Sequence, residues 1–151
     1  MNLSGVFANP VLIAALMAWS LAQAIKVPLE YARNRRWDFA LLFRAGGMPS
    51  SHSALIAATT HAIGLFDGFY TPLYALAFVV AMVVIYDATG IRRQAGKHAE
   101  IINAMIKDLA SGHPLHEQQL REVLGHTPME ALTGTLLGIT IAQTLWIALR
   151  P

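Results

Sequence analysis

Four long apolar segments, none of which contains Lys, Arg, Asp or Glu, alternate with polar stretches along the chain. They cover roughly residues 8–25, 53–66, 69–86 and 131–149. A helix needs about 20 residues to cross a bilayer, with a range of about 17–25. The first, third and fourth segments have that length, whereas the second reaches it only by including polar residues at its ends. The pattern predicts an all-α integral-membrane bundle of about four transmembrane helices.

The composition agrees with a chain that is solvated by lipid. Its 151 residues are 55% hydrophobic and 13% charged, whereas soluble domains carry about 25% charged residues. The length suits a single membrane-embedded domain over 1–151, and the lack of cysteine excludes disulfides and thiolate metal sites. A soluble bundle of buried helices is the alternative. The Ala-Gln-Ala at 22–24 resembles a signal-peptidase site, but no basic residue precedes the first segment, so we expect an uncleaved first helix.

Basic residues gather in two of the three connections between the apolar segments. Five lie between the first and second segments and five between the third and fourth, out of 11 in the chain. Cytoplasmic loops of membrane proteins are enriched in Lys and Arg, so we expect residues 26–52 and 87–130 at the cytoplasmic face and both termini outside. The two loops then share one membrane face and are able to form one site. The alternative is that these charges only set the topology.

The second basic loop has a further pattern at 91–109. Apolar residues recur there at helical spacing, and charged residues take the other faces. This periodicity predicts an amphipathic helix that lies at the membrane interface or covers a site.

The stretch GGMPSSHSA, residues 46–54, concentrates turn-forming and polar residues directly before the second apolar segment. Glycines accept backbone angles that other residues resist, and a serine at a helix start caps free N–H groups. Those N–H groups and the helix dipole together attract an anion. We therefore expect a phosphate-sized anion site, with Ser51 as a hydroxyl donor and His52 as a proton carrier. The alternative is an ordinary helix cap followed by a surface histidine.

A similar arrangement of Gly, His and Pro precedes the last apolar segment, in REVLGHTPMEALTG at 121–134. His126 and Glu130 are four residues apart, and a carboxylate on one imidazole nitrogen fixes the tautomer and leaves the other nitrogen free to attack. Thr127 and Glu130 also match a capping box with Pro128 at the first helical position. In that alternative Glu130 reaches back to the backbone instead. Pro128 also predicts that His126 lies in the turn before the helix.

Three separated motifs, Lys26-x6-Arg33, PSSH at 49–52 and His126-x3-Glu130, resemble the signature of the type 2 phosphatidic acid phosphatase superfamily. That superfamily holds lipid phosphatases and vanadium haloperoxidases. The strings GGMPSSHSA, YDATGIRRQAG and LGHTPMEALTG more closely resemble its small divergent branch, the acid phosphatase/vanadium-dependent haloperoxidase-related proteins. The match runs from residue 26 to residue 138.

The resemblance implies a phosphatase that uses no metal and no cofactor. His126 would attack phosphorus to form a phosphohistidine, Glu130 would orient His126, and His52 would protonate the leaving alcohol. Basic and hydroxyl side chains would hold the phosphoryl oxygens, and the expected set is Lys26, Arg33, Arg36, Ser50, Ser51, Arg92 and Arg93. Arg35 or Arg36 could serve in place of Arg33. Taken singly, each arginine is better explained by nonspecific contacts with anionic lipid head groups, whereas the whole set, beside two histidines at helix starts, favours phosphate binding.

The chain also departs from the superfamily pattern. Ser51 replaces a glycine, Leu120 occupies the place of an arginine, Glu130 replaces an aspartate, and there is room for about four helices instead of six. We expect Arg92 or Arg93 to supply the missing arginine. A noncatalytic membrane scaffold or anionic-lipid-binding protein that kept the fold is the alternative function, and a vanadate-dependent oxidase is a less favoured one. Asp87, with Glu130 and the histidines, is the candidate for a metal site.

These expectations combine into a lipid-phosphate phosphatase of a bacterial-type inner or plasma membrane, with its site facing the cytoplasm. The expected substrate is an amphiphile with a phosphomonoester or diphosphate head, such as a phosphatidylglycerophosphate-like lipid or a polyprenyl phosphate. The membrane and its lipids are the expected partners and nucleic acid is not, while self-association into a homo-oligomer is left open.

Overall fold

The protein is a bundle of helices. The computed structural model describes residues 4–43, 46–89, 98–99, 101–103, 105–107, 109 and 126–150. The elements in chain order are α1 (Ser4–Phe7), α2 (Pro10–Asn34), the 3-10 turn η1 (Phe39–Leu42), α3 (Ser51–Ile63), the π-helical turn η2 (Gly64–Gly68), α4 (Pro72–Thr89) and α6 (Pro128–Leu149). The expected all-α architecture is confirmed.

Among the described residues, three helices, α2, α4 and α6, are long and apolar enough to cross a membrane. The expected second span corresponds to α3, of 13 residues, which runs on into the five residues of η2, so the helical stretch covers residues 51–68 and includes polar residues at both ends. Lipid-facing surface is plain on α4, which buries only Ala81 and Ala88 and exposes large apolar side chains on its other faces. Those side chains include Leu73, Leu76, Phe78, Val79, Val80, Met82 and Val83. Such a surface fits an integral-membrane bundle and not the soluble alternative.

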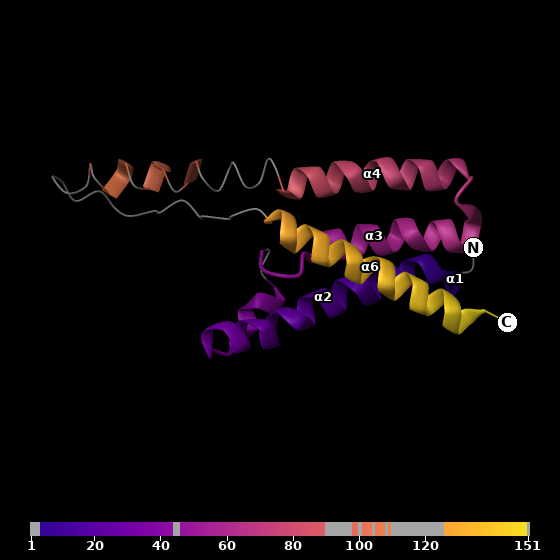
Figure 1. Cartoon of the computed structure of the whole chain (residues 1–151), viewed down its shortest axis with the longest axis horizontal. Coiled ribbons are helices and arrows are strands. Elements are labelled where there is room, and N and C mark those ends of the chain that lie inside the picture. The colour runs from indigo at the N-terminus through magenta and orange to yellow at the C-terminus, as the bar shows by residue number, and fades with distance from the viewer. Residues whose placement is uncertain are drawn as a thin grey trace.

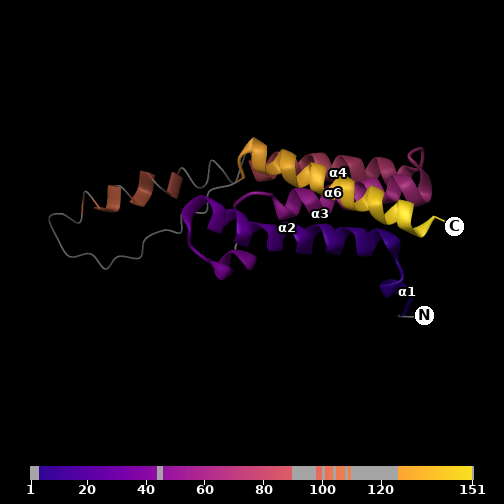
Figure 2. The same cartoon turned by 60° about the horizontal axis from the view of Figure 1, so that its bottom comes forward.

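The short helix α3 lies at the centre of the bundle, where it contacts α2, α4 and α6. Figures 1 and 2 show these helices running side by side, with both chain termini at one end. The N-terminal ends of α3 and α6 and the C-terminal ends of α2 and α4 lie at the opposite end. The two polar motifs that precede α3 and α6 therefore lead into the bundle at the same end, opposite the chain termini.

Close packing of α2, α3 and α6 depends on small residues at every fourth position. The core cluster consists of Ala14, Ala18 and Ala22 from α2, Ala54, Ala58 and Ala62 from α3, and Ala142 from α6. Gly134 and Gly138 extend the line on α6, and a Cβ on either would lie 2.2 Å from an α3 carbonyl oxygen, that of Ser50 or Ala54. Such small-residue contacts let membrane helices approach closely. Continued by one more step of four, the three lines reach Lys26, Ser50 and Glu130, all at the polar end.

Two boundaries differ from the expectation. The first apolar segment was expected to end at residue 25, with Lys26 and Arg33 in a loop, but α2 continues to Asn34 and includes Pro28. Polar residues mark the end of the apolar segment but not of the helix, because packing against the bundle end sustains the helix through them. In the region of the expected amphipathic helix, the described residues between His98 and Leu109 are helical, and the others lie outside the described residues.

Candidate functional site

The start of α3 is built from the first of the two polar motifs. Gly46 and Gly47 have φ angles of 101° and 77°, in the left-handed region that favours glycine. Ser50 is the helix cap: its Oγ accepts hydrogen bonds from the Ser53 backbone N–H at 3.3 Å and from the Ser53 hydroxyl at 3.0 Å. Ser50 and Ser51 are buried. The motif thus places a capped helix N-terminus, with its positive dipole end, at the polar end of the bundle.

The start of α6 combines the two arrangements that the sequence offered as alternatives. The Glu130 backbone N–H donates to Thr127 Oγ1 at 3.3 Å, and Glu130 Oε2 accepts from the Thr127 N–H at 3.1 Å, which completes the capping box. The same Oε2 lies 3.0 Å from His126 Nδ1. One carboxylate oxygen therefore serves both the backbone and the imidazole, and His126 lies in the turn before the helix, as Pro128 predicted.

The contact with Glu130 fixes the chemistry of the His126 ring. An ionised carboxylate only accepts hydrogen bonds, so Nδ1 is the donor in this contact, and in the neutral ring Nε2 keeps a lone pair. The His126 backbone is fixed as well, because its N–H donates to the Ala88 carbonyl at the end of α4 at 3.0 Å. His126 is buried, with 5% of its surface exposed. The arrangement provides an oriented nucleophilic or basic nitrogen.

Backbone contacts bring the two motifs together. The Ser50 N–H donates to the Glu130 carbonyl at 2.9 Å, and Gly134 packs directly against the Ser50 carbonyl. His52, which is exposed, consequently faces His126 with 6.2 Å between ring centroids. The two rings are therefore close enough to reach one common small group.

A pocket of about 620 Å³ lies between α2, the 46–49 loop and the start of α6; it borders Glu130, which contacts His126, but neither imidazole lines it. Its polar lining comes from Lys26, Glu30, Arg33, Thr127 and Glu130. Lys26 and Arg33 share one face of α2 because they are seven residues, or about two turns, apart. Lys26 is 2% exposed, and its Nζ has no hydrogen-bond partner among the described residues.

The carboxylates of the pocket are already engaged. Glu30 accepts a hydrogen bond from Asn34 Nδ2, and Glu130 serves His126 and Thr127. Glu130 attracts the Lys26 ammonium electrostatically but supplies it with no hydrogen bond. A buried ammonium costs free energy unless an acceptor takes its hydrogen bonds. The pocket is therefore suited to an anion that several donors contact at once.

The structure gathers most of the expected site residues. Lys26, Arg33, Ser50, Ser51, His52, His126 and Glu130 all lie at this end of the bundle. Arg36 is exposed and does not line the pocket, and Arg35 ends α2 with its guanidinium 5.9 Å from the Tyr31 ring centroid. Arg92 and Arg93 lie outside the described residues. Asp87 is near the end of α4, and no group of three metal-ligating side chains occurs within the part of the chain described.

Sequence reasoning missed two contributors. Glu30 lies one turn from both Lys26 and Arg33, and this helical spacing would have identified it had α2 been extended beyond Ile25. The pair Gly134-x3-Gly138 is a small-residue signature of close helix contact, and it sets how near Glu130 lies to Ser50. Both signals are present in the printed sequence.

Comparison with known proteins agrees with the motifs. The model of the Divergent PAP2 family matches residues 7–141. The chain is 37% identical over 145 residues to "Uncharacterized membrane protein YuiD" of Bacillus subtilis (strain 168), a match that covers 89% of this chain and 92% of that protein. No solved structure gives a significant match. The resemblance drawn from the three motifs is therefore confirmed at the level of the family: this chain belongs to the Divergent PAP2 family, a divergent branch of the type 2 phosphatidic acid phosphatases.

Proposed function

We propose that this membrane protein is a lipid-phosphate phosphatase that acts through a phosphohistidine on His126. The observation that carries the proposal is the His126 ring, which Glu130 holds at 3.0 Å through Nδ1 and which faces His52 at 6.2 Å between centroids. A nucleophile oriented by a carboxylate, opposite a second group that transfers protons, is the minimum that phosphoryl transfer to a side chain requires.

In the first step His126 Nε2 attacks the phosphorus atom. The N–P bond forms as the P–O bond to the lipid alcohol breaks, and His52 donates a proton to the departing oxygen. Glu130 stabilises the positive charge that develops on the His126 ring. In the second step His52 accepts a proton from water, the water oxygen attacks phosphorus, the N–P bond breaks, and inorganic phosphate leaves with His126 restored.

Fixed hydrogen-bond donors stabilise the charge on the transferring group. Lys26 supplies an ammonium that is buried and lacks a partner among the described residues, and Arg33 lines the same pocket. The N-terminus of α3 adds its dipole and the hydroxyls of Ser50 and Ser51. Such preorganised donors account for most of the rate enhancement in phosphoryl transfer. Arg92 and Arg93 are proposed to complete the set.

The substrate follows from the placement of the site at one end of a lipid-embedded bundle. A phosphate head group reaches the His52–His126 pair while its hydrocarbon part stays in the bilayer. We propose a phosphomonoester or diphosphate lipid, of the phosphatidylglycerophosphate or polyprenyl phosphate type, and, from the distribution of basic residues, the cytoplasmic face.

Phosphate release from purified protein tests the proposal. Wild type, His126→Ala, His52→Ala and His61→Ala are compared on a lipid phosphate and on a soluble aryl phosphate. His61 is the imidazole control on the soluble ester, because it lies at the other end of α3 and contacts Gln143 at 3.1 Å. We expect His126→Ala and His52→Ala to lose phosphate release. His61→Ala should keep wild-type release from the soluble ester, and vanadate should inhibit the wild-type protein. Unchanged release in His126→Ala refutes the mechanism, and head-group binding without any release identifies the noncatalytic alternative.

A further inference from the structure

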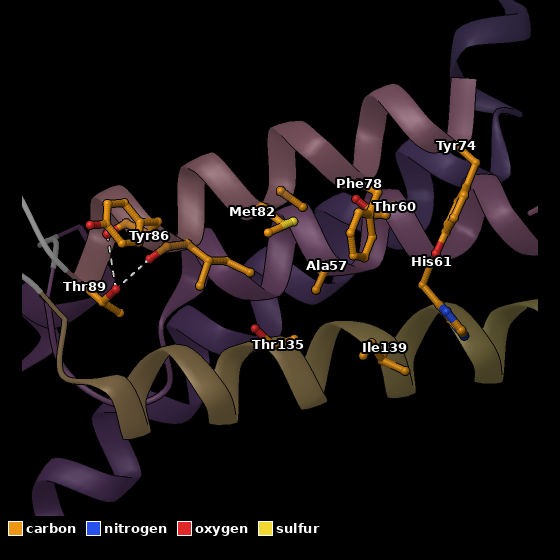
Figure 3. Close-up of a pocket in the computed structure, with 12 residues that line it drawn as sticks. Ala57, Thr60, His61, Tyr74, Phe78, Met82, Tyr86, Thr89, Thr135 and Ile139 are labelled. Carbon is orange, nitrogen blue, oxygen red and sulfur yellow. Dashed lines mark hydrogen bonds between the residues drawn. The ribbon is translucent and has the colours of Figure 1, made fainter. Parts of the chain in front are cut away.

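A second cavity, of about 470 Å³, lies between α4 and α6 with α3 as its floor (Figure 3). We propose that this groove holds one hydrocarbon chain of the lipid phosphate, so that the substrate enters sideways from the bilayer. The inference rests on the proposed function for its head group, and it adds how the lipid part is recognised. The volume lies within the range of about 300–1,000 Å³ that small-molecule pockets occupy.

The lining of this groove is chemically apolar even where the residues are polar. Thr60, Thr89 and Thr135 donate their hydroxyl hydrogens to carbonyls one turn earlier in their own helices, at 2.9, 3.0 and 2.9 Å. Their methyl groups remain for contacts in the groove. With Ala57, Met82 and Ile139 they form a surface of methyl, aliphatic and thioether groups. Such a surface stabilises hydrocarbon, and the hydrogen-bonding side chains Tyr86, Tyr74 and His61 lie at the two ends of the groove.

The groove ends next to the candidate site. Tyr86 and Thr89 line it there, and between them in α4 lies Ala88, whose carbonyl accepts the His126 N–H. At the other end Tyr74 and His61 complete the lining, and Figure 3 shows Tyr74 extending from α4 toward His61, whose ring points toward α6 and contacts Gln143 at 3.1 Å. A chain in the groove therefore has its head at the His52–His126 pair.

The dimensions favour a single chain over a helix from a partner or a second copy. From Tyr74 to Thr89 the groove follows about 22 Å of helix at 1.5 Å per residue. A helix about 10 Å across and of that length occupies roughly 1,700 Å³, which is several times the cavity volume. A helix is thus able only to cover the groove, whereas a hydrocarbon chain is able to fill it.

A pair of tryptophan variants on α6 tests the groove. Ile139→Trp places a large ring in it, whereas Leu136→Trp, one turn earlier and outside the lining, is the matched control. Both are assayed in nanodiscs on alkyl phosphates of increasing chain length and on a soluble aryl phosphate. We expect kcat/KM of wild type and control to rise with chain length. The kcat/KM of Ile139→Trp should fall about tenfold on the longest chain, as expected when about two methylene groups are displaced. On the soluble ester its kcat/KM should equal that of wild type.

A binding experiment separates failure of the groove from failure of the proposed function. A nonhydrolysable alkyl phosphonate with a diazirine in its chain is photolysed with the protein in nanodiscs, and the labelled residues are mapped by mass spectrometry. Labelling concentrated on groove residues such as Met82 and Ile139 supports the groove even if no variant releases phosphate. The inference is overturned if labelling falls elsewhere, if a neutral diacyl lipid labels the groove equally, or if Ile139→Trp keeps the full chain-length dependence.

Discussion

Substituting Gly134 by Ala perturbs one of the contacts that hold the two motifs together. The added Cβ would lie 2.2 Å from the Ser50 carbonyl oxygen, against the 3.4 Å of ordinary van der Waals contact, a shortfall of about 1.2 Å. The obstacle is backbone, so α3 and α6 have to separate, since no side chain is able to turn away. Overpacking of this kind costs about 1–3 kcal/mol, and the better helix propensity of Ala returns only about 1 kcal/mol.

The expected result is a lower melting temperature together with a loss of activity. The net cost of up to about 2 kcal/mol lowers Tm by up to roughly 8 °C in a chain of this size, and a displacement of about 1 Å at reacting groups costs on the order of 100-fold in rate. Tm is followed by tryptophan fluorescence in detergent, and rate by phosphate release. Gly5→Ala is the control, because its Cβ meets nothing within 4 Å. If Gly134→Ala melts and turns over like Gly5→Ala, the close α3–α6 contact is wrong.

Three further substitutions test individual parts of the site. Lys26→Met should raise Tm, because it removes a buried ammonium that lacks a hydrogen-bond partner among the described residues. It should also abolish the rise in Tm that we expect when vanadate binds to the wild-type protein. A lower Tm of the variant would contradict this. Thr127→Ala should cost about 1 kcal/mol through loss of the helix cap, measured as a drop in Tm, while Thr127→Ser should retain the cap. Arg33→Ala should weaken vanadate binding in a titration and Arg36→Ala should not, because only Arg33 lines the pocket; equal effects would mean that the pocket does not select between them.

The local features of the site were predictable from the sequence, because they depend on residues close together in the chain. Ser50 and Thr127 cap their helices as serine and threonine before an apolar run predict. The position of His126 in a turn follows from Pro128. The double role of Glu130 was not predictable, because each alternative was complete by itself and only the coordinates show one oxygen serving both.

The features that depend on tertiary contacts could not be predicted from the sequence. Lys26 looks like a loop residue because it ends an apolar run, yet it is buried within α2 by packing at the bundle end. The central position of α3 was equally hidden, since a short, serine- and threonine-containing segment looks like a weak span. Its polar residues are tolerated because α2, α4 and α6 surround it.

The most direct measurement on the account is a trap for the covalent intermediate. The His52→Ala variant is mixed with a lipid phosphate, quenched in alkali to preserve phosphohistidine, digested and analysed by mass spectrometry. The account predicts a phosphoryl group on His126, more abundant in His52→Ala than in wild type because His52 activates the water of the second step. Release of phosphate by wild type with no phosphorylation of His126 in either protein would contradict it.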